Sequence, residues 1–425
     1  MRVSSLVLFC ALSLPVSGRA EDLDMPKPQD AFDLLAPDTM ATAHPRWRGA
    51  ATQAGAAWGG FLAWPSFGAG ALVDNNPLQR HVANGAATGL RLTPCLVLER
   101  ESGVHATAFY GAADARLYPA RPDADQLDGR LGVLHDWAPR RDLILRLQGE
   151  LSQARDPLDS RAAVTGTARG DPFTSRTASV TASVQKSFKA VFVSLGGGVA
   201  RSTFTESAVR TSTGAPGLSS ETDTEIKARV GARLGPALFV FAEPAANWRV
   251  LDAVPARSQG SRVVAGLGVG EIGLLGGEVY AGAQRQDYTL RPRTVAEPVF
   301  GGRLSWSPDP AWTATLAVDR GLEQARVGTA AQPLGTPLDV VRETATLRAA
   351  PSRFWSGELA LQHATVRYLG SGRTDDLLGA EAALAVPWRH DLDLLADLNL
   401  TRVRSSLVIA SYSRAVATLG LRYRY

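Results

Sequence analysis

The sequence predicts an all-β protein, a transmembrane antiparallel up-and-down β-barrel of about 18 strands, with 16 strands as the alternative count. Three observations lead to this prediction. Long segments alternate apolar and polar side chains, short turns marked by proline or charge recur between them, and the last segment alternates up to an aromatic residue at the end. Segments of this kind separated by turn residues are typical of barrel strands.

The first 57 residues precede the alternating part. Residues 1–20 have a charged start, an apolar run from Val3 to Val16 and small residues before Ala20, which is the pattern of a signal peptide cut after Ala20. The run is too short to span a bilayer as a helix. Residues 21–57 are rich in Pro, Ala and Asp and are predicted to form a periplasmic segment without its own core. The barrel is predicted to occupy residues 58–425.

Composition excludes several classes of protein. After the signal peptide the chain has no apolar stretch of about 18 residues, so it offers no transmembrane helix. The mature part keeps only Cys95, which excludes a domain stapled by disulfides. The formal net charge is +4 and the basic residues are dispersed. Nucleic acid is therefore not an expected partner, since its binding requires clustered basic residues.

The alternation assigns side chains to two faces, because successive residues of a strand point to opposite sides. Residues 143–152, 225–234, 391–401 and 415–425 each place mainly apolar residues on one face and polar or charged residues on the other. A helix would instead require apolar residues three and four apart. The charged residues of these segments are the predicted lining of the lumen: Arg146, Glu150, Glu225, Lys227, Arg229, Arg233, Asp393, Asp397, Arg422 and Arg424.

Short turns give the strand count. They are predicted at residues 99–103, 139–142, 186–189, 235–236, 273–277, 307–310, 351–353 and 387–390. Longer polar loops lie between them, for example at residues 155–173, 205–220 and 327–337. Eight short turns and nine long loops, with both chain ends on one side, give 18 strands. Residues 259–290 are rich in glycine and weakly patterned, which leaves 16 strands open.

A soluble β-sandwich or propeller would also alternate, so alternation alone does not establish a membrane protein. Three features favour the membrane. One face carries charges of both signs, as in a water-filled lumen, and the strands are long enough for a tilted span. Aromatic residues also gather at strand ends, as in the interfacial girdles of barrels. They are Trp58, Phe61, Trp64, Trp137, Trp306, Trp312, Phe354, Trp355 and Trp388.

The end of the chain indicates how the barrel is assembled. The final segment alternates through Tyr423 to Tyr425, the last residue. A terminal strand with a final aromatic residue resembles the signal that the β-barrel assembly machinery of the outer membrane recognises. Tyr423 and Tyr425 are therefore the predicted assembly signal. The expected location is the outer membrane of a Gram-negative cell, with that machinery and the surrounding lipid and lipopolysaccharide as partners.

The beginning of the predicted barrel resembles a known family. The stretch Gly60–Gly70, with Asp74-Asn75-Asn76 after it, is similar to the first strand and loop of the family Putative β-barrel porin 2. Pro94, Leu96 and Leu98, and then residues 105–118, resemble its second and third strands. The similarity covers about the first hundred residues of the barrel and is architectural beyond them. It implies a porin-like barrel without catalytic residues, and some similar barrels accompany exopolysaccharide export.

Several motifs could carry chemistry, but each has a simpler structural explanation. His135-Asp136 and His390-Asp391 are adjacent residues that a strand would place on opposite faces, so no catalytic site, metal site or cofactor is predicted. The glycine clusters 196–198 and 266–270 are followed by no helix, so they are expected in the barrel wall and not around a phosphate. Asp74-Asn75-Asn76-Pro77 could bind a cation, but a turn is the simpler interpretation.

Two functions remain open at this point. The first is a passive, porin-like channel for small hydrophilic solutes, because a barrel of this size leaves an aqueous lumen. The second is a non-enzymatic component or scaffold of an envelope or exopolysaccharide export system, with export proteins as partners and a closed lumen. Neither function is enzymatic.

Overall fold

The computed structural model describes residues 56–425 except 84, 157–172, 206–218, 236, 253–255, 273, 290–292, 310, 326–334, 353 and 425. The predicted signal peptide, nearly all of the predicted periplasmic segment, most of the three long loops named above and Tyr425 therefore lie outside the described residues. Within the described part, no helix is long and apolar enough to cross a membrane.

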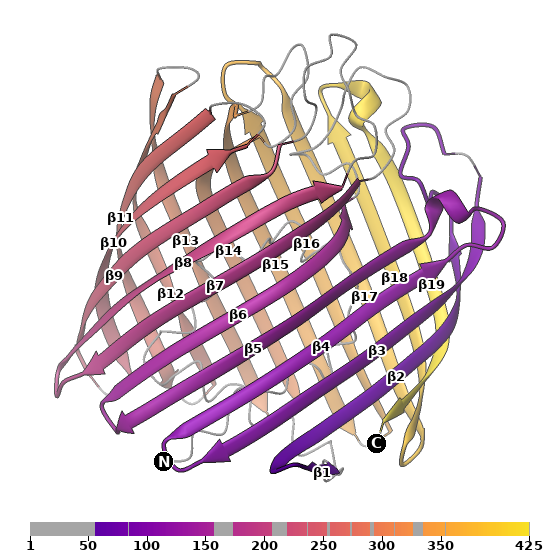
Figure 1. The fold of residues 1–425 in the computed structure, drawn as a ribbon, viewed down its shortest axis with the longest axis horizontal. Coiled ribbons are helices and arrows are strands. Elements are labelled where there is room, and N and C mark those ends of the chain that lie inside the picture. Colours follow the sequence, from indigo (N-terminus) through magenta and orange to yellow (C-terminus); the bar gives the residue numbers. More distant parts are fainter. Residues whose placement is uncertain are drawn as a thin grey trace.

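The described chain forms one antiparallel sheet that closes into a barrel (Figure 1), which confirms the predicted fold class. Eighteen strands, β2 to β19, make up the wall, and the alternative count of 16 is wrong. The strands are β1 (Ala56–Trp58), β2 (Phe61–Asp74), β3 (Ala87–Ser102), β4 (His105–Leu117), β5 (Gln126–Arg140), β6 (Leu143–Asp156), β7 (Phe173–Ser187), β8 (Val191–Thr205), β9 (Glu221–Arg233), β10 (Leu238–Leu251), β11 (Ala256–Ile272), β12 (Leu275–Tyr288), β13 (Arg293–Asp309), β14 (Trp312–Gln324), β15 (Pro337–Ser352), β16 (Trp355–Tyr368), β17 (Thr374–Arg389), β18 (Leu392–Ser405) and β19 (Tyr412–Arg424). Two short 3-10 helices, η2 (Pro122–Ala124) and η3 (Val408–Ala410), lie between strands.

Each strand pairs with its neighbours in the sequence, and the barrel closes where β19 pairs with β2. This seam runs from Val416 opposite Asp74 to Arg424 opposite Ser66. The short strand β1 folds back on β2 beside the seam. The end of β19 lies at the end of the barrel that carries the short connections (Figure 1). We call this the turn end and the opposite one the loop end.

Each of the eight predicted turns overlaps a short connection at the turn end, from β3–β4 and β5–β6 to β17–β18. Several predicted ranges extend into the strands, as residues 99–103 do into β3, which ends at Ser102. Several of these junctions contain a register shift beside the turn, as between Trp137 and Arg140 and between Pro387 and Arg389. Proline and charged residues at these positions favour a turn over continued pairing.

The two faces of the wall differ as the alternation requires. On β9, Ile226 and Val230 are 50% and 51% exposed, while Lys227 and Arg229 between them are 2% and 4% exposed. The buried set faces inward, because Arg229 bonds to Glu278 of β12, which is three strands away around the wall. Only the concave side of a closed sheet can bring such strands together. The outer face is therefore apolar and the inner face polar, as in membrane barrels.

Inward glycines explain the weak pattern of residues 259–290. A side chain at Gly266 or Gly268 of β11 would overlap the ring of Phe241 or Phe239 of β10. Gly231 of β9 makes room for Phe192 of β8 in the same way. The cluster 266–270 and the cluster 196–198 thus lie within β11 and β8, in the barrel wall as predicted. Glycine commonly marks such close approach within a strand.

The predicted aromatic girdle needs one correction. Trp58, Trp137, Trp306 and Trp388 are strongly exposed near the turn end. Trp64 instead packs against Cys95 and Val97 of β3. It shares the even-numbered positions of β2 with the buried Leu72 and Asp74 and therefore faces inward.

Candidate functional site: the inner wall of the barrel

The inner wall carries the only extensive polar surface that the described strands enclose, so we consider it the candidate site. The ten residues predicted to line the lumen all occupy inward positions of their strands. The structure places nine of them in or beside three separate groups of ion pairs and hydrogen bonds, and the tenth, Arg233, lies apart from these groups.

The first group lies on β9 to β12 around two glutamates. Arg229 donates to Glu243 at 2.7 Å and to Glu278 at 2.9 Å. Arg262 donates to Glu243 at 2.9 Å, and Lys227 lies 3.9 Å from the same carboxylate. Of the predicted residues, Lys227 and Arg229 meet here, with the buried Glu225 on the same strand.

An aromatic surface supports this group. The guanidinium of Arg229 lies over the Phe241 ring, 4.2 Å from its centroid. Phe192, Phe239 and Phe241 form a buried cluster, and Tyr280 packs against it. These rings fill the space above the inward glycines and hold the cations close to the wall. Arg262 and Glu278 were not predicted because they lie in the glycine-rich, weakly patterned residues 259–290. Glu243 was not predicted because its inward neighbours on β10, Phe239, Phe241 and Ala245, are apolar and give no alternation.

The second group joins the two ends of the barrel sheet. Asp393 of β18 accepts from Arg422 at 2.7 Å and from Arg424 at 2.7 Å, both on β19. Asp397 accepts from Arg91 of β3 at 3.3 Å, across β19 and β2. Arg91 also bonds to Asp114 of β4 at 3.1 Å. The structure thus brings four predicted residues together with partners that were not predicted.

Arg146 and Glu150 of β6 form the third group, with neighbours on β4 and β5. Arg146 makes two hydrogen bonds to Asp136, at 2.6 and 2.8 Å. Glu150 accepts from the hydroxyl of Tyr110 at 2.5 Å. Arg233 stands apart near the turn end of β9, where it lies opposite Phe239.

A further ion pair at the loop end was not predicted. Arg414 of β19 bonds to Asp74 of β2, with its Nε 2.8 Å from the carboxylate, and the Tyr118 hydroxyl donates to Asp74 at 2.8 Å. The backbone N–H of Asn76 donates to Asp74 as well, at 2.9 Å. The sequence marked Asp74 as the start of a turn, but it could not show that Arg414 lies opposite it. The carboxylate serves the seam of the barrel.

The stretch of wall between the third group and the first, on β7 and β8, carries no charged side chain at its described inward positions. The inward positions of β7 are Ser175, Thr177, Ser179, Thr181, Ser183 and Gln185. Thr177 shares a hydrogen bond with Ser202 of β8, and both side chains are buried. One side of the interior is thus lined by hydroxyl groups, and the two sides next to it by ion pairs.

The first of the two adjacent histidine and aspartate pairs is split between the two faces of β5, as expected for strand residues, and the second lies in a turn. Asp136 faces inward to Arg146, while His135 bonds to Thr107 at 2.9 Å and lies 3.4 Å from His105. His390 and Asp391 lie in the last turn, 3.6 Å apart, with the histidine almost fully exposed. In the described part of the chain, no group of three or more His, Cys, Asp or Glu side chains is placed to hold a metal ion.

Of the two predicted assembly residues, Tyr423 is described. It is 46% exposed and lies on the outer face beside the seam, opposite Phe67 of β2 and Leu392 of β18.

The sequence profile of one protein family, Putative β-barrel porin 2, matches residues 50–425. The chain belongs to this family. The match extends through the whole barrel, well beyond the first strands on which the resemblance was based. No curated protein matches the sequence.

Three solved structures are similar in fold to this chain. The siderophore receptor PirA from Pseudomonas aeruginosa is 8% identical with a TM-score of 0.43, over 85% of this chain and 80% of that one. The FrpB iron transporter from Neisseria meningitidis is 8% identical with a TM-score of 0.45, over 84% and 67%. The siderophore receptor PirA from Acinetobacter baumannii is 6% identical with a TM-score of 0.44, over 85% and 80%. With TM-scores below 0.5, none of these structures informs the function of this chain.

Proposed function

We propose that this member of the porin family is an outer-membrane channel through which small hydrophilic solutes diffuse passively. The supporting observation is the division of a closed wall into an apolar outer face and an inner face that carries charges of both signs. An apolar belt of this kind suits lipid, and a polar interior suits water.

The proposed lining is the set of ten predicted residues together with their partners. Most of these charges are paired, as Arg229 is with Glu243 and Glu278, so the interior has little excess of either sign in these groups. Arg303, at an inward position of β13 near the turn end, is exposed, which fits access of water to the wall. We therefore expect weak selectivity between anions and cations.

The proposal includes a location and partners. The chain is exported through a signal peptide that is cut after Ala20, residues 21–57 remain in the periplasm, and the assembly machinery reads Tyr423 and Tyr425. The outer face, with exposed residues such as Leu151, Leu316 and Leu419, then contacts lipid and lipopolysaccharide. Transport, and not catalysis, is the proposed role.

A second function is favoured by one observation. Many inward charged side chains are almost inaccessible, for example Lys227 at 2% and Glu243 at 2%, because they pack against one another along the wall. A barrel with a closed interior would serve as a non-enzymatic component or scaffold of an envelope or exopolysaccharide export system.

Planar-bilayer recording separates the two functions. The purified full-length mature chain should give stepwise openings with an ohmic current in potassium chloride, and liposomes that contain it should swell in an uncharged sugar. Heat-unfolded protein from the same preparation is the control. If the folded protein gives neither current nor swelling, the channel is refuted and the second function is favoured.

A further inference from the structure

The ladder between β13 and β14 stops halfway up the wall. Their pairing extends from Asp309 opposite Trp312 to Gly301 opposite Asp319. Above that level β13 stays paired with β12 up to Arg293, and β14 stays paired with β15 up to Gln324. The described residues of the two strands therefore separate towards the loop end.

The end of β14 lies inside the barrel. The backbone N–H of Leu322 donates to the side-chain amide of Gln284 at 3.0 Å, and the Leu322 carbonyl accepts from Gln284 at 3.5 Å and from Arg249 at 3.2 Å. Gln284 belongs to β12 and Arg249 to β10, so β14 has crossed in front of the strands next to it. The backbone groups of Leu322, which would otherwise pair with β13, are thus bonded to side chains of β10 and β12.

The sequence of β13 explains the separation. If the ladder continued in register, Leu322 would lie opposite Pro298 and Glu323 opposite Glu297. The Leu322 amide and carbonyl both point to this edge, so the position requires a partner that donates and accepts. Pro298 has no N–H to donate, and two carboxylates placed opposite each other repel. The Gln284 side chain accepts from the Leu322 N–H and donates to the Leu322 carbonyl, and this second bond is the one that Pro298 cannot make.

Ion pairs fill the space between the two layers. Arg320 of β14 bonds to Glu297 of β13 at 3.0 Å and to Asp339 of β15 at 3.0 Å. Arg342 of β15 lies 2.7 Å from Glu323, and Ser258 of β11 donates to Gln324 at 2.9 Å. Leu322 and Leu316 are both at even-numbered positions of β14 and point to the same side of this strand. Leu316 is exposed, but Leu322 is only 2% exposed because the strands of the wall cover this side of β14 near its end.

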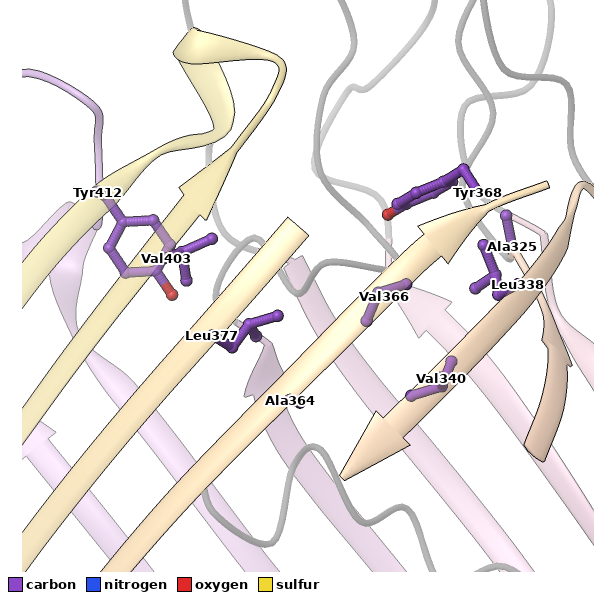
Figure 2. Close-up of a cluster of buried hydrophobic side chains, with 9 residues drawn as sticks. All are labelled: Ala325, Leu338, Val340, Ala364, Val366, Tyr368, Leu377, Val403 and Tyr412. Carbon is purple, nitrogen blue, oxygen red and sulfur yellow. The ribbon is translucent and has the colours of Figure 1, made fainter. Parts of the chain in front are cut away.

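Apolar residues hold the other side of the folded-in segment. Ala325, Leu338 and Val340 belong to a buried cluster that continues over the inward positions of β16 to β19 (Figure 2). Figure 2 shows the cluster extending across the strands, from Ala325 and Leu338 to Val403 and Tyr412. The segment is therefore anchored by polar contacts on one side and by apolar packing on the other.

We propose that this segment, which we call the arm (residues 320–324 of β14 and 337–339 of β15), is the constriction that limits passage through the lumen. Gln284 fixes the position of the arm, because its side chain donates to the Leu322 carbonyl in place of the N–H that Pro298 lacks. The inference rests on the proposed channel function, since a constriction has meaning only for a conducting lumen. The width of the lumen at the arm then sets the largest solute that can pass.

Two variants of the full-length mature chain test this proposal. Gln284→Leu removes both bonds to Leu322 with little change in volume. Pro298→Thr restores an N–H to β13 and allows β14 to pair with it. The control is Gln362→Leu, which changes an inward glutamine of β16. Single-channel conductance and hydrogen exchange of the Leu322 amide are measured for each variant.

In Gln284→Leu the Leu322 amide should exchange about 2- to 13-fold faster, the factor for loss of one typical hydrogen bond. Both variants should conduct more than wild type and admit larger sugars in liposome swelling, while Gln362→Leu matches wild type. Unchanged exchange in Gln284→Leu would refute the role of Gln284. Faster exchange with unchanged conductance would refute the constriction. If wild type and all variants are silent but exchange rises, the channel proposal and the constriction fail, while the anchoring of the arm stands.

Discussion

Two pairs of neighbouring strands, β19–β2 and β13–β14, are hydrogen-bonded over only part of their length. In each pair a side-chain amide replaces the missing backbone partner, with a different result. At the seam, β19 and β2 pair up to Val416 opposite Asp74. Beyond this point Asn75 takes the place of a strand, since its backbone donates to the Ala415 carbonyl at 3.1 Å and its side chain accepts from the Ala415 N–H at 2.8 Å. Between β13 and β14, Gln284 also replaces a backbone partner, but it holds β14 away from its neighbour.

The difference teaches that an amide side chain can extend a ladder or divert it, depending on which strand carries the amide. Asn75 directly follows β2 and continues its edge, so the wall stays closed. Gln284 lies on the inner face of β12, two strands from β14, so the bonded strand is drawn inward. The seam also has a charged lock, the Asp74–Arg414 pair, whereas the β13–β14 junction has Arg320 spanning the gap to Glu297.

Breaking the Asp74–Arg414 ion pair at the seam should cause the largest loss of stability. Arg414→Leu leaves the fully buried Asp74 carboxylate without its cation, and breaking a buried pair in this way costs about 3–5 kcal/mol. The measurement is the urea midpoint of the barrel in detergent micelles. Arg201→Gln, which breaks the exposed pair with Asp252, is the matched control and should cost about 0–1 kcal/mol. Equal midpoints for the two variants would mean that the seam does not depend on the lock.

A charge on the outer face should cost the same at either junction, because the cost arises from lipid and not from the ladder. Leu419→Arg on β19 and Leu316→Arg on β14 replace residues that are 70% and 59% exposed. Each should lose about 2–4 kcal/mol if it lies near the bilayer midplane. Folding into liposomes is compared with Gln148→Arg, which places the charge on the inner face of β6. If all three insert equally well, the proposed membrane face is wrong.

Adding a methyl group at the closely packed seam should cause a smaller loss of stability. Gly70 and Gly420 lie opposite each other, and a Cβ on Gly420 would come within 2.5 Å of the Ala69 carbonyl oxygen. Gly420→Ala should therefore destabilise the barrel by about 1–3 kcal/mol, as overpacking does. Gly149→Ala is the control, because its Cβ would meet nothing closer than 3.5 Å. The same loss in both variants would show that glycine flexibility, and not contact at the seam, is responsible.

The sequence predicted the wall well and its irregularities poorly, for a physical reason. Alternation and turn residues depend on neighbours in the chain, so the strand count, the turns and the inward position of residues such as Arg229 could be predicted. The partners of Arg229 depend on which strands face each other across the interior, and this follows only from closure. A proline such as Pro298 can interrupt a ladder, but the sequence does not show that Gln284 lies opposite the freed edge of β14, because this depends on the register of three strands.

The last prediction concerns how the seam forms and has the smallest effect on the finished barrel. Tyr425 lies outside the described residues and follows Arg424, the last described residue that pairs across the seam. If the assembly machinery reads it before β19 joins β2, Tyr425→Ser should raise the unfolded periplasmic fraction in cells and leave the thermal midpoint of the refolded barrel nearly unchanged. The contrast is Arg414→Leu, which should lower the midpoint because it acts on the closed seam. A large drop in the midpoint of Tyr425→Ser with a normal rate of insertion would make Tyr425 a packing residue, and the terminal aromatic would no longer support assembly in the outer membrane.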